Sequence, residues 1–131
     1  MYKIFGWINV ALVIIMISPF VLRWINAHAF KVPKAASTKL VNALRTLHKI
    51  LGGLLLASAV THAILALSAW QWHTGIILGI AAELAAIFAV MFYIFKKKWL
   101  FLTHRIIAGV VILLLLVHLI FPSAMYSIFG L

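Results

Sequence analysis

Two stretches of the sequence decide the fold, HKILGGLLLASAVTH at residues 48–62 and HRIIAGVVILLLLVH at residues 104–118. Each begins and ends with a histidine, and the residues between are mainly apolar. Fourteen residues are close to four turns of an α-helix, so the two histidines of a stretch return to within about 40° of one face. The helical rise separates them by about 21 Å, most of the depth of a bilayer. Each stretch is therefore predicted to span a membrane with one imidazole toward either end.

The composition around these stretches is that of a membrane protein. Hydrophobic residues make up 67% of the 131 residues and charged residues 9%, and the mean hydropathy is +1.24. Such a chain is implausible as a soluble domain. Its apolar segments predict an all-α transmembrane four-helix bundle, a single domain over residues 1–131 with no soluble nucleotide- or flavin-binding domain. The expected helices cover approximately residues 4–25, 43–69, 74–95 and 100–121.

Several classes of function lack the residues they require. The chain contains no cysteine, which excludes disulfides, thiolate metal sites and covalent heme attachment through Cys-x-x-Cys-His. With one acidic residue in the chain, hydrolytic catalysis lacks its usual groups. No glycine-rich phosphate loop is present, and no nucleic-acid partner is expected despite a net charge of +10.

The eleven basic residues are distributed as in a membrane protein of fixed orientation. Six flank the first connection and four flank the third, so with four spans ten of the eleven fall on one side. The positive-inside rule places these connections in the cytoplasm and both chain ends outside. We therefore expect an integral protein of a cytoplasmic membrane, prokaryotic in type and surrounded by lipid. The residues are Arg23, Lys31, Lys34, Lys39, Arg45 and Lys49 at the first connection, Lys96, Lys97, Lys98 and Arg105 at the third, and Lys3 on the other side.

The connections are expected to differ in length. Residues 26–41 are predicted to form the only long loop, polar and basic, with Ser37 and Thr38 capping the second helix. A tight turn at residues 71–74 and a coil at residues 123–131 are expected on the outer side.

The first segment is expected to remain as a helix rather than to be removed as a signal peptide. Its apolar run is long, and a single lysine, Lys3, precedes it. Pro19 lies inside this segment, where proline usually produces a kink that neighbouring groups tolerate.

The two histidine stretches repeat each other at an interval of 56 residues. HKILGG from His48 matches HRIIAG from His104, and the same interval carries His62 onto His118. The second and fourth segments run in the same direction, so His48 is expected level with His104 and His62 level with His118. Two apolar helices are often similar by chance, but the joint recurrence of histidine, a basic residue and glycine favours a shared role. The rest of the two halves does not align well.

Four histidines in this arrangement predict a cofactor. Imidazole inside hydrocarbon is costly and indicates a function, although a single one would more often be a contact between helices. Two equal spacings on helices of the same direction give two histidine pairs, one above the other. Imidazole is a good iron ligand, and helix bundles build cofactor sites from facing helices. We expect two b-type hemes, an inner one on His48 and His104 and an outer one on His62 and His118.

Residues beside the inner histidines fit the edge of a heme. Arg45, Lys49 and Arg105 are placed to pair with propionates near the cytoplasmic boundary, although topology and snorkelling also account for basic residues there. Gly52 and Ala108 lie one turn from the inner histidines. Their small size leaves room either for the ring or for a close approach of helices.

Through His48, His62, His104 and His118, residues 43–121 resemble the diheme b-type cytochromes. These include the transmembrane core of the ferric reductases and NADPH oxidases, and the cytochrome b of the quinol–cytochrome c oxidoreductases. In both families two helices each supply two histidines at a similar spacing, and the hemes stack across the membrane. The chain departs from both in size, because it lacks the flavin and nicotinamide domains of the first and the extra helices of the second. The resemblance implies a minimal member that works with separate redox partner proteins, as a monomer or in a homo- or hetero-oligomer.

Other residues give weaker signals. Glu83, the only acidic residue, lies mid-segment, where an ionised carboxylate is costly. A structural hydrogen bond is the first interpretation, and a proton relay or a quinone contact is the second. His28 and His73 are expected to be surface histidines in connections on opposite faces. Gly75 and Gly79 are spaced for packing against a neighbouring helix, inside the monomer rather than between protomers.

The expected function is transmembrane electron transfer through two stacked bis-histidine b hemes, between a donor and an acceptor on opposite faces. The first alternative is a quinone-reactive cytochrome b subunit that anchors a soluble dehydrogenase, with quinone as a further cofactor. The second is a metal or proton transporter that uses the intramembrane histidines. Donor, acceptor, direction and redox potentials are not fixed by the sequence.

Overall fold

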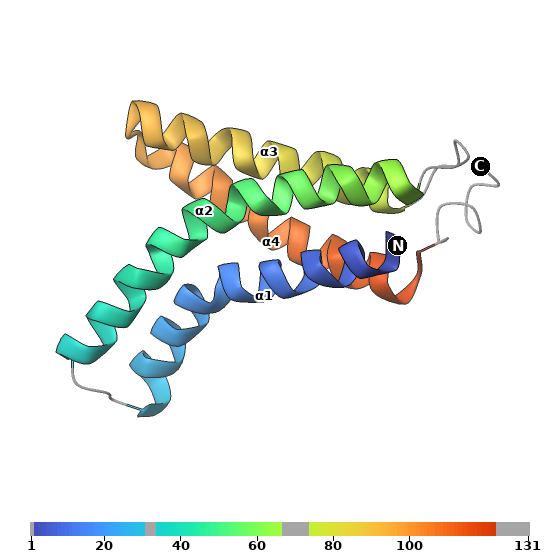
Figure 1. Ribbon diagram of the computed structural model, residues 1–131. Coiled ribbons are helices and arrows are strands. Elements are labelled where there is room, and N and C mark those ends of the chain that lie inside the picture. The colour runs from blue at the N-terminus through green and yellow to red at the C-terminus, as the bar shows by residue number, and fades with distance from the viewer. Residues whose placement is uncertain (1, 31–33, 67–73, 123–131) are drawn as a thin grey trace. The chain divides into compact units, whose positions relative to one another are not determined.

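The computed structural model describes residues 2–30, 34–66 and 74–122 (Figure 1). These residues are helical except at short connections, and no strand occurs among them. The expected all-α fold with four long helices is confirmed. The elements are α1 (Tyr2–Ile25), the π-helix η1 (Asn26–Phe30), α2 (Lys34–Ala66), α3 (Thr74–Phe95) and α4 (Lys98–Ile120).

Four helical segments are long and apolar enough to cross a membrane. Their mean hydropathies are 2.3, 1.7, 2.3 and 2.5 in chain order. Large apolar side chains point away from the helix contacts, as Trp7 at 68% and Ile64 at 70% exposure illustrate. Such surfaces suit lipid rather than water as the surrounding medium, and they indicate a membrane-embedded protein. The candidate spans are Lys3–Ala29, Thr38–Ala66, Thr74–Phe95 and Lys98–Ile120.

The second helix begins earlier than the sequence predicts. α2 starts at Lys34 rather than near residue 43, and η1 continues directly from α1, so the long loop expected at residues 26–41 is wrong. Hydropathy marks only the apolar part of a helix, whereas alanine, lysine and leucine, which dominate this stretch, favour continued helix. Ser37 and Thr38 consequently lie within α2 rather than at its start.

The other boundaries agree closely with the expectation. α3 covers 74–95 as predicted, and α4 begins at Lys98 and ends at Ile120, close to the predicted limits. Three predicted features fall outside the described residues, namely the end of the second helix near residue 69, the turn at 71–73 with His73, and the coil at 123–131.

The chain divides into two compact units, Met1–His62 and Ala63–Leu131. In the first unit α1 runs antiparallel to α2, since Gly6 lies against His62 and Met16 against His48. In the second unit α3 and α4 lie side by side and antiparallel, joined by a two-residue turn (Figure 1).

Within α1, the buried Pro19 is accommodated by its neighbour. Proline has no N–H, so it cannot donate to the carbonyl of Ile15 four residues earlier. The Ser18 hydroxyl donates to that oxygen instead, at 2.7 Å. The helix therefore continues through the proline with its orphaned carbonyl satisfied, as membrane helices require.

The turn between α3 and α4 is made by Lys96 and Lys97. Lys96 has φ 55°, the left-handed conformation, and its N–H donates to Phe92 O at 2.9 Å. Lys97 is extended and its carbonyl accepts from Leu100 N–H at 3.1 Å, which starts α4. The side chain of Leu100 is only 1% exposed, so this end of the helix pair is the best packed part of the second unit.

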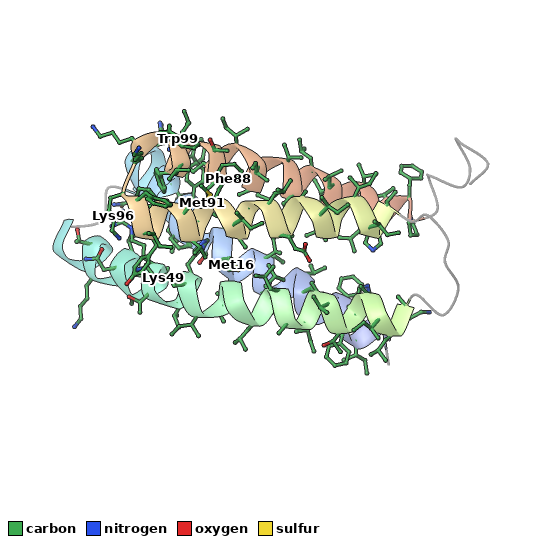
Figure 2. The ribbon with its side chains drawn as sticks, turned by 90° about the horizontal axis from the view of Figure 1, so that it is seen from above. Met16, Lys49, Phe88, Met91, Lys96 and Trp99 are labelled. Atoms are coloured by element: carbon green, nitrogen blue, oxygen red, sulfur yellow. The ribbon has the colours of Figure 1, made fainter. Side chains whose placement is uncertain are left out.

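Aromatic side chains complete the packing at this end. Phe88 meets Trp99 edge-on with ring centroids 6.4 Å apart. Phe92 packs on Phe101 at 5.1 Å. Figure 2 shows Phe88, Met91 and Trp99 gathered beside the turn at Lys96. These contacts fix the register of α4 against α3, and that register positions the histidines of α4.

Candidate functional site

The four histidines are half-buried, and each contacts the neighbouring helix of its own unit. His48 and His62 lie on α2 and contact α1, whereas His104 and His118 lie on α4 and contact α3. The sequence predicts the two helices that carry the histidines. The structure in addition shows contacts that hold each ring.

The two inner histidines are held by main-chain oxygens. Nδ1 of His48 lies 2.9 Å from the carbonyl oxygen of Met16. Nδ1 of His104 lies 2.8 Å from that of Ala85. A carbonyl oxygen can only accept, so Nδ1 carries the proton in both rings. In the neutral imidazole Nε2 then bears the lone pair, the state in which histidine usually binds a metal.

The outer histidine of the second unit is held by a hydroxyl. Nδ1 of His118 lies 2.9 Å from Oγ1 of Thr74, and this hydroxyl donates to the carbonyl of Pro122 at 3.0 Å. The single hydroxyl proton is used by that second bond, so Oγ1 accepts from Nδ1 of His118. The lone pair of His118 therefore also resides on Nε2. Thr74 is the only buried polar residue in the described part of the chain, with 7% exposure.

Two glycines make room for the outer imidazoles. A β-carbon on Gly75 would lie 3.1 Å from Cε1 of His118, and one on Gly6 would lie 3.2 Å from Cε1 of His62. Any side chain at either position would press on the ring. Gly75 contacts a neighbouring helix of the same chain, as predicted, whereas nothing described lies within 4 Å of a β-carbon on Gly79.

The contacts reveal a repeat that includes the helices without histidines. Gly6 and Gly75 are 69 residues apart. Met16 on α1 and Ala85 on α3, whose carbonyl oxygens accept from the inner histidines, are also 69 residues apart. The histidines repeat at 56 residues. The interval is larger for α1 and α3 because the connection after α1 is longer than the turn after α3. A search at one interval therefore misses the equivalence of the two helix pairs.

Sequence reasoning missed the residues that hold the rings, Met16, Ala85, Thr74 and Gly6. Every residue has a main-chain carbonyl, so the amino-acid type does not indicate that Met16 and Ala85 are the acceptors. The only available signal was the shared interval between Gly6 and Gly75 and its agreement with the histidine spacing on the following helices.

The predicted basic residues lie near the inner histidines and are exposed. Arg45 donates to Oδ1 of Asn42 at 3.4 Å, and the guanidinium of Arg105 lies 5.8 Å from the ring centre of Phe101. Lys49 follows His48 on α2 (Figure 2).

Gly52 lies on the face of α2 that contacts α1. A β-carbon on Gly52 would lie 3.7 Å from the methyl of Met16, an ordinary contact. Met16 thus meets α2 twice, through its carbonyl at His48 and through its side chain at Gly52.

The remaining candidates are exposed. Glu83 makes no hydrogen bond or ion pair with any other described residue, so the structural hydrogen bond expected for it is not present in this part of the chain. His28 is exposed, as predicted, but belongs to η1 rather than to a loop. Its Nδ1 donates to Trp24 O at 2.8 Å, and the two rings stack with centroids 4.9 Å apart.

The arrangement is suited to binding a metal-centred cofactor through Nε2. In His48, His104 and His118 an oxygen holds Nδ1–H, which fixes the tautomer and the orientation of the ring. No three His, Cys, Asp or Glu residues gather in the described ranges in a way that could hold a metal ion. Histidine binds heme iron through such a ring nitrogen, so the donor type of each ring fits heme.

Comparisons with protein-family models, with curated proteins and with solved structures found no match to this chain. Arguments about function therefore rest on the residues and contacts described above.

Proposed function

We propose that this protein is a diheme b-type cytochrome that carries electrons across a membrane. The inner heme would take His48 and His104 as axial ligands, and the outer heme His62 and His118. The observation that carries the proposal is the equivalence of the two helix pairs. Each pair presents two histidines fourteen residues apart, with the inner Nδ1 on a main-chain carbonyl and the outer ring against a glycine.

The protein's own residues would set the properties of such a centre. The oxygens that accept from Nδ1–H make Nε2 a stronger donor and stop the imidazole from rotating. When bound, heme supplies a one-electron ferric–ferrous couple. With two histidines holding each heme, the chemistry that the group would supply is outer-sphere electron transfer rather than reaction of a substrate at iron. The spacing of each histidine pair sets the two levels about 21 Å apart along the helix axis.

The exposed basic residues beside the inner histidines support the same assignment. Arg45, Lys49 and Arg105 are placed to neutralise the propionates of the inner heme. By the positive-inside rule this end of the protein faces the cytoplasm and the chain ends face outward. Electrons would pass outward from a cytoplasmic or quinol donor to a separate acceptor, by analogy with the reductases that the histidine pattern resembles.

The test is the reduced-minus-oxidised absorbance spectrum of the purified full-length chain, with heme quantified as pyridine hemochrome. We expect a b-type α band and two hemes per chain. His48→Ala and His104→Ala should each remove the inner heme, and His62→Ala and His118→Ala the outer one. His28→Ala is the matched control, because His28 is exposed in η1 and its Nδ1 bonds its own helical segment.

Two results would overturn the proposal. A colourless protein expressed with sufficient heme would require a new role for the four histidines, as ligands of a metal ion or as a proton path. Loss of heme in the His28→Ala control as large as in the other variants would show that the losses reflect general damage to the fold.

A further inference from the structure

The outer histidine of the second unit is held by a chain of two hydrogen bonds. In the second unit Oγ1 of Thr74 accepts a hydrogen bond from Nδ1 of His118 at 2.9 Å, and its hydroxyl donates a hydrogen bond to Pro122 O at 3.0 Å. At the interval of 69 residues that relates α1 to α3, the position equivalent to Thr74 is Phe5. Phenylalanine has no hydrogen-bonding side-chain atom, so this chain of two bonds exists in the second unit and has no counterpart at Phe5.

The Thr74 bond can be removed by a side-chain substitution. The inner rings of His48 and His104 are held by main-chain oxygens, which persist whatever side chain is present. Thr74 is buried at the start of α3, and its contact with Pro122 ties the end of α4 to that point. A hydroxyl that is itself donating is a better acceptor, because bonds in a chain polarise one another.

We infer that Thr74 is a positioning residue that lowers the redox potential of the outer heme through His118. This inference rests on the proposed function. An acceptor at Nδ1 gives the imidazole partial imidazolate character, which strengthens Nε2 as a donor. A stronger donor stabilises ferric over ferrous iron, so the Thr74 bond opposes reduction of the outer heme. The contacts of Thr74 are with His118 and Pro122, so the potential of the inner heme should be unaffected.

The experiment is a potentiometric titration of both hemes in the full-length protein carrying Thr74→Val. Valine keeps the shape and removes the acceptor. We expect the ferrous-to-ferric ratio of the outer heme to rise about tenfold at a fixed potential, which corresponds to an upward shift of ~59 mV for one electron. Thr74→Ser keeps the hydroxyl and should restore the wild-type value.

Thr61→Val is the matched control. Thr61 precedes the outer ligand His62, but its hydroxyl donates to Ala57 O of its own helix at 2.9 Å. Its loss should leave both potentials unchanged. An unshifted outer potential in Thr74→Val, or an equal shift in Thr74→Ser or Thr61→Val, would overturn the inference.

A second measurement separates this inference from the proposed function. Nitrogen-15 spectra of the histidines in the heme-free protein report which ring nitrogen carries the proton. We expect His118 to be protonated at Nδ1 in the wild type and in Thr74→Ser, and to lose this preference in Thr74→Val. A wild type without Nδ1–H on His118 overturns the inference even where the valine variant does not fold. A protein that shows this tautomer but never binds heme refutes the function and leaves the Thr74–His118 bond intact.

Discussion

The carbonyl oxygen of Met16 accepts a hydrogen bond from Nδ1 of His48 at 2.9 Å, across the contact between α1 and α2. Its equivalent in the second unit is the bond from His104 to Ala85 at 2.8 Å. A main-chain acceptor depends on the register of two helices and not on a side chain. The orientation of the inner histidines is therefore controlled by everything that sets helix register, including small residues, caps and turns.

Alanine at the glycines beside the outer histidines should disturb the rings more than the fold. In Gly6→Ala and Gly75→Ala the new β-carbon would lie 3.2 and 3.1 Å from a ring carbon, so the imidazole must move by a few tenths of an ångström. We expect loss or weakening of the outer heme alone, and a cost of about 1 kcal/mol or more from overpacking. Heme content and the free energy of unfolding in mixed micelles measure both.

The controls for these substitutions are Gly53→Ala and Gly109→Ala. The two glycines are equivalent at the 56-residue interval, and nothing described lies within 4 Å of a β-carbon at either one. Alanine should stabilise these helices by up to about 1 kcal/mol. If all four variants behave alike, the close approach of glycine and imidazole has no consequence.

Removal of the Ser18 hydroxyl should cost stability only while Pro19 is present. Ser18→Ala leaves Ile15 O without its donor, and we expect a loss of about 1 kcal/mol. In Pro19→Ala the restored N–H can donate to Ile15 O, so the additional Ser18→Ala change should cost little. A double-mutant cycle on the free energy of unfolding measures this coupling. Additive losses would show that Ser18 acts by some other contact.

Leucine at Asn9 should stabilise the first unit. The side-chain atoms Asn9 Oδ1 and Ser58 Oγ are shielded from solvent and have no hydrogen-bond partner among the described residues. The positions equivalent to them in the second unit are Leu78 and Leu114. An unpaired buried acceptor costs about 1–3 kcal/mol, so Asn9→Leu should raise the free energy of unfolding by about 1 kcal/mol.

The matched control for Asn9 is Asn42→Leu. Oδ1 of Asn42 already accepts from Arg45 at 3.4 Å, and the residue is exposed, so no gain is expected there. Equal gains in both variants would mean that the added apolar surface, and not the unpaired oxygen, is responsible.

Glycine at Lys96 should stabilise the turn between α3 and α4. Lys96 has φ 55°, a conformation that costs a residue with a β-carbon about 1 kcal/mol or more and costs glycine little. The gain in Lys96→Gly is reduced by loss of the contact between its ammonium group and the Tyr93 ring, 4.1 Å apart. We expect a net increase in thermal stability. Lys97→Gly, where φ is −81°, should give a decrease. A decrease in both would refute the argument from strain.

The sequence predicts the long helices well because membrane spans are marked by length and hydropathy. Both predicted ends of α3 are confirmed, since the apolar segment and the helix cover the same residues. The predicted start of α2 is wrong, because the helix begins at Lys34 and includes polar residues that hydropathy assigns to a loop. Helix propensity over that stretch would have indicated the correct start.

The candidate site also has a part that the sequence predicts and a part that it does not. His48, His62, His104 and His118 could be placed on helix faces from their spacing alone. Their hydrogen-bond partners could not, because a partner on another helix depends on register, which is set by packing around residues such as Leu100. The start of the third helix at Thr74 could be predicted, but the burial of this residue and its bond to His118 could not.

The unequal intervals of 69 and 56 residues have a mechanical consequence. All the extra length of the first helix pair lies in and around η1 and the start of α2, beyond the contacts that hold the histidines. In each unit the distance between the two histidines is set by an uninterrupted α-helix, whose rise per residue does not depend on the connections. Insertions, deletions or cleavage in the basic segment between α1 and α2 can therefore alter what the protein meets on that face. The axial spacing of the two histidines on each helix would stay the same.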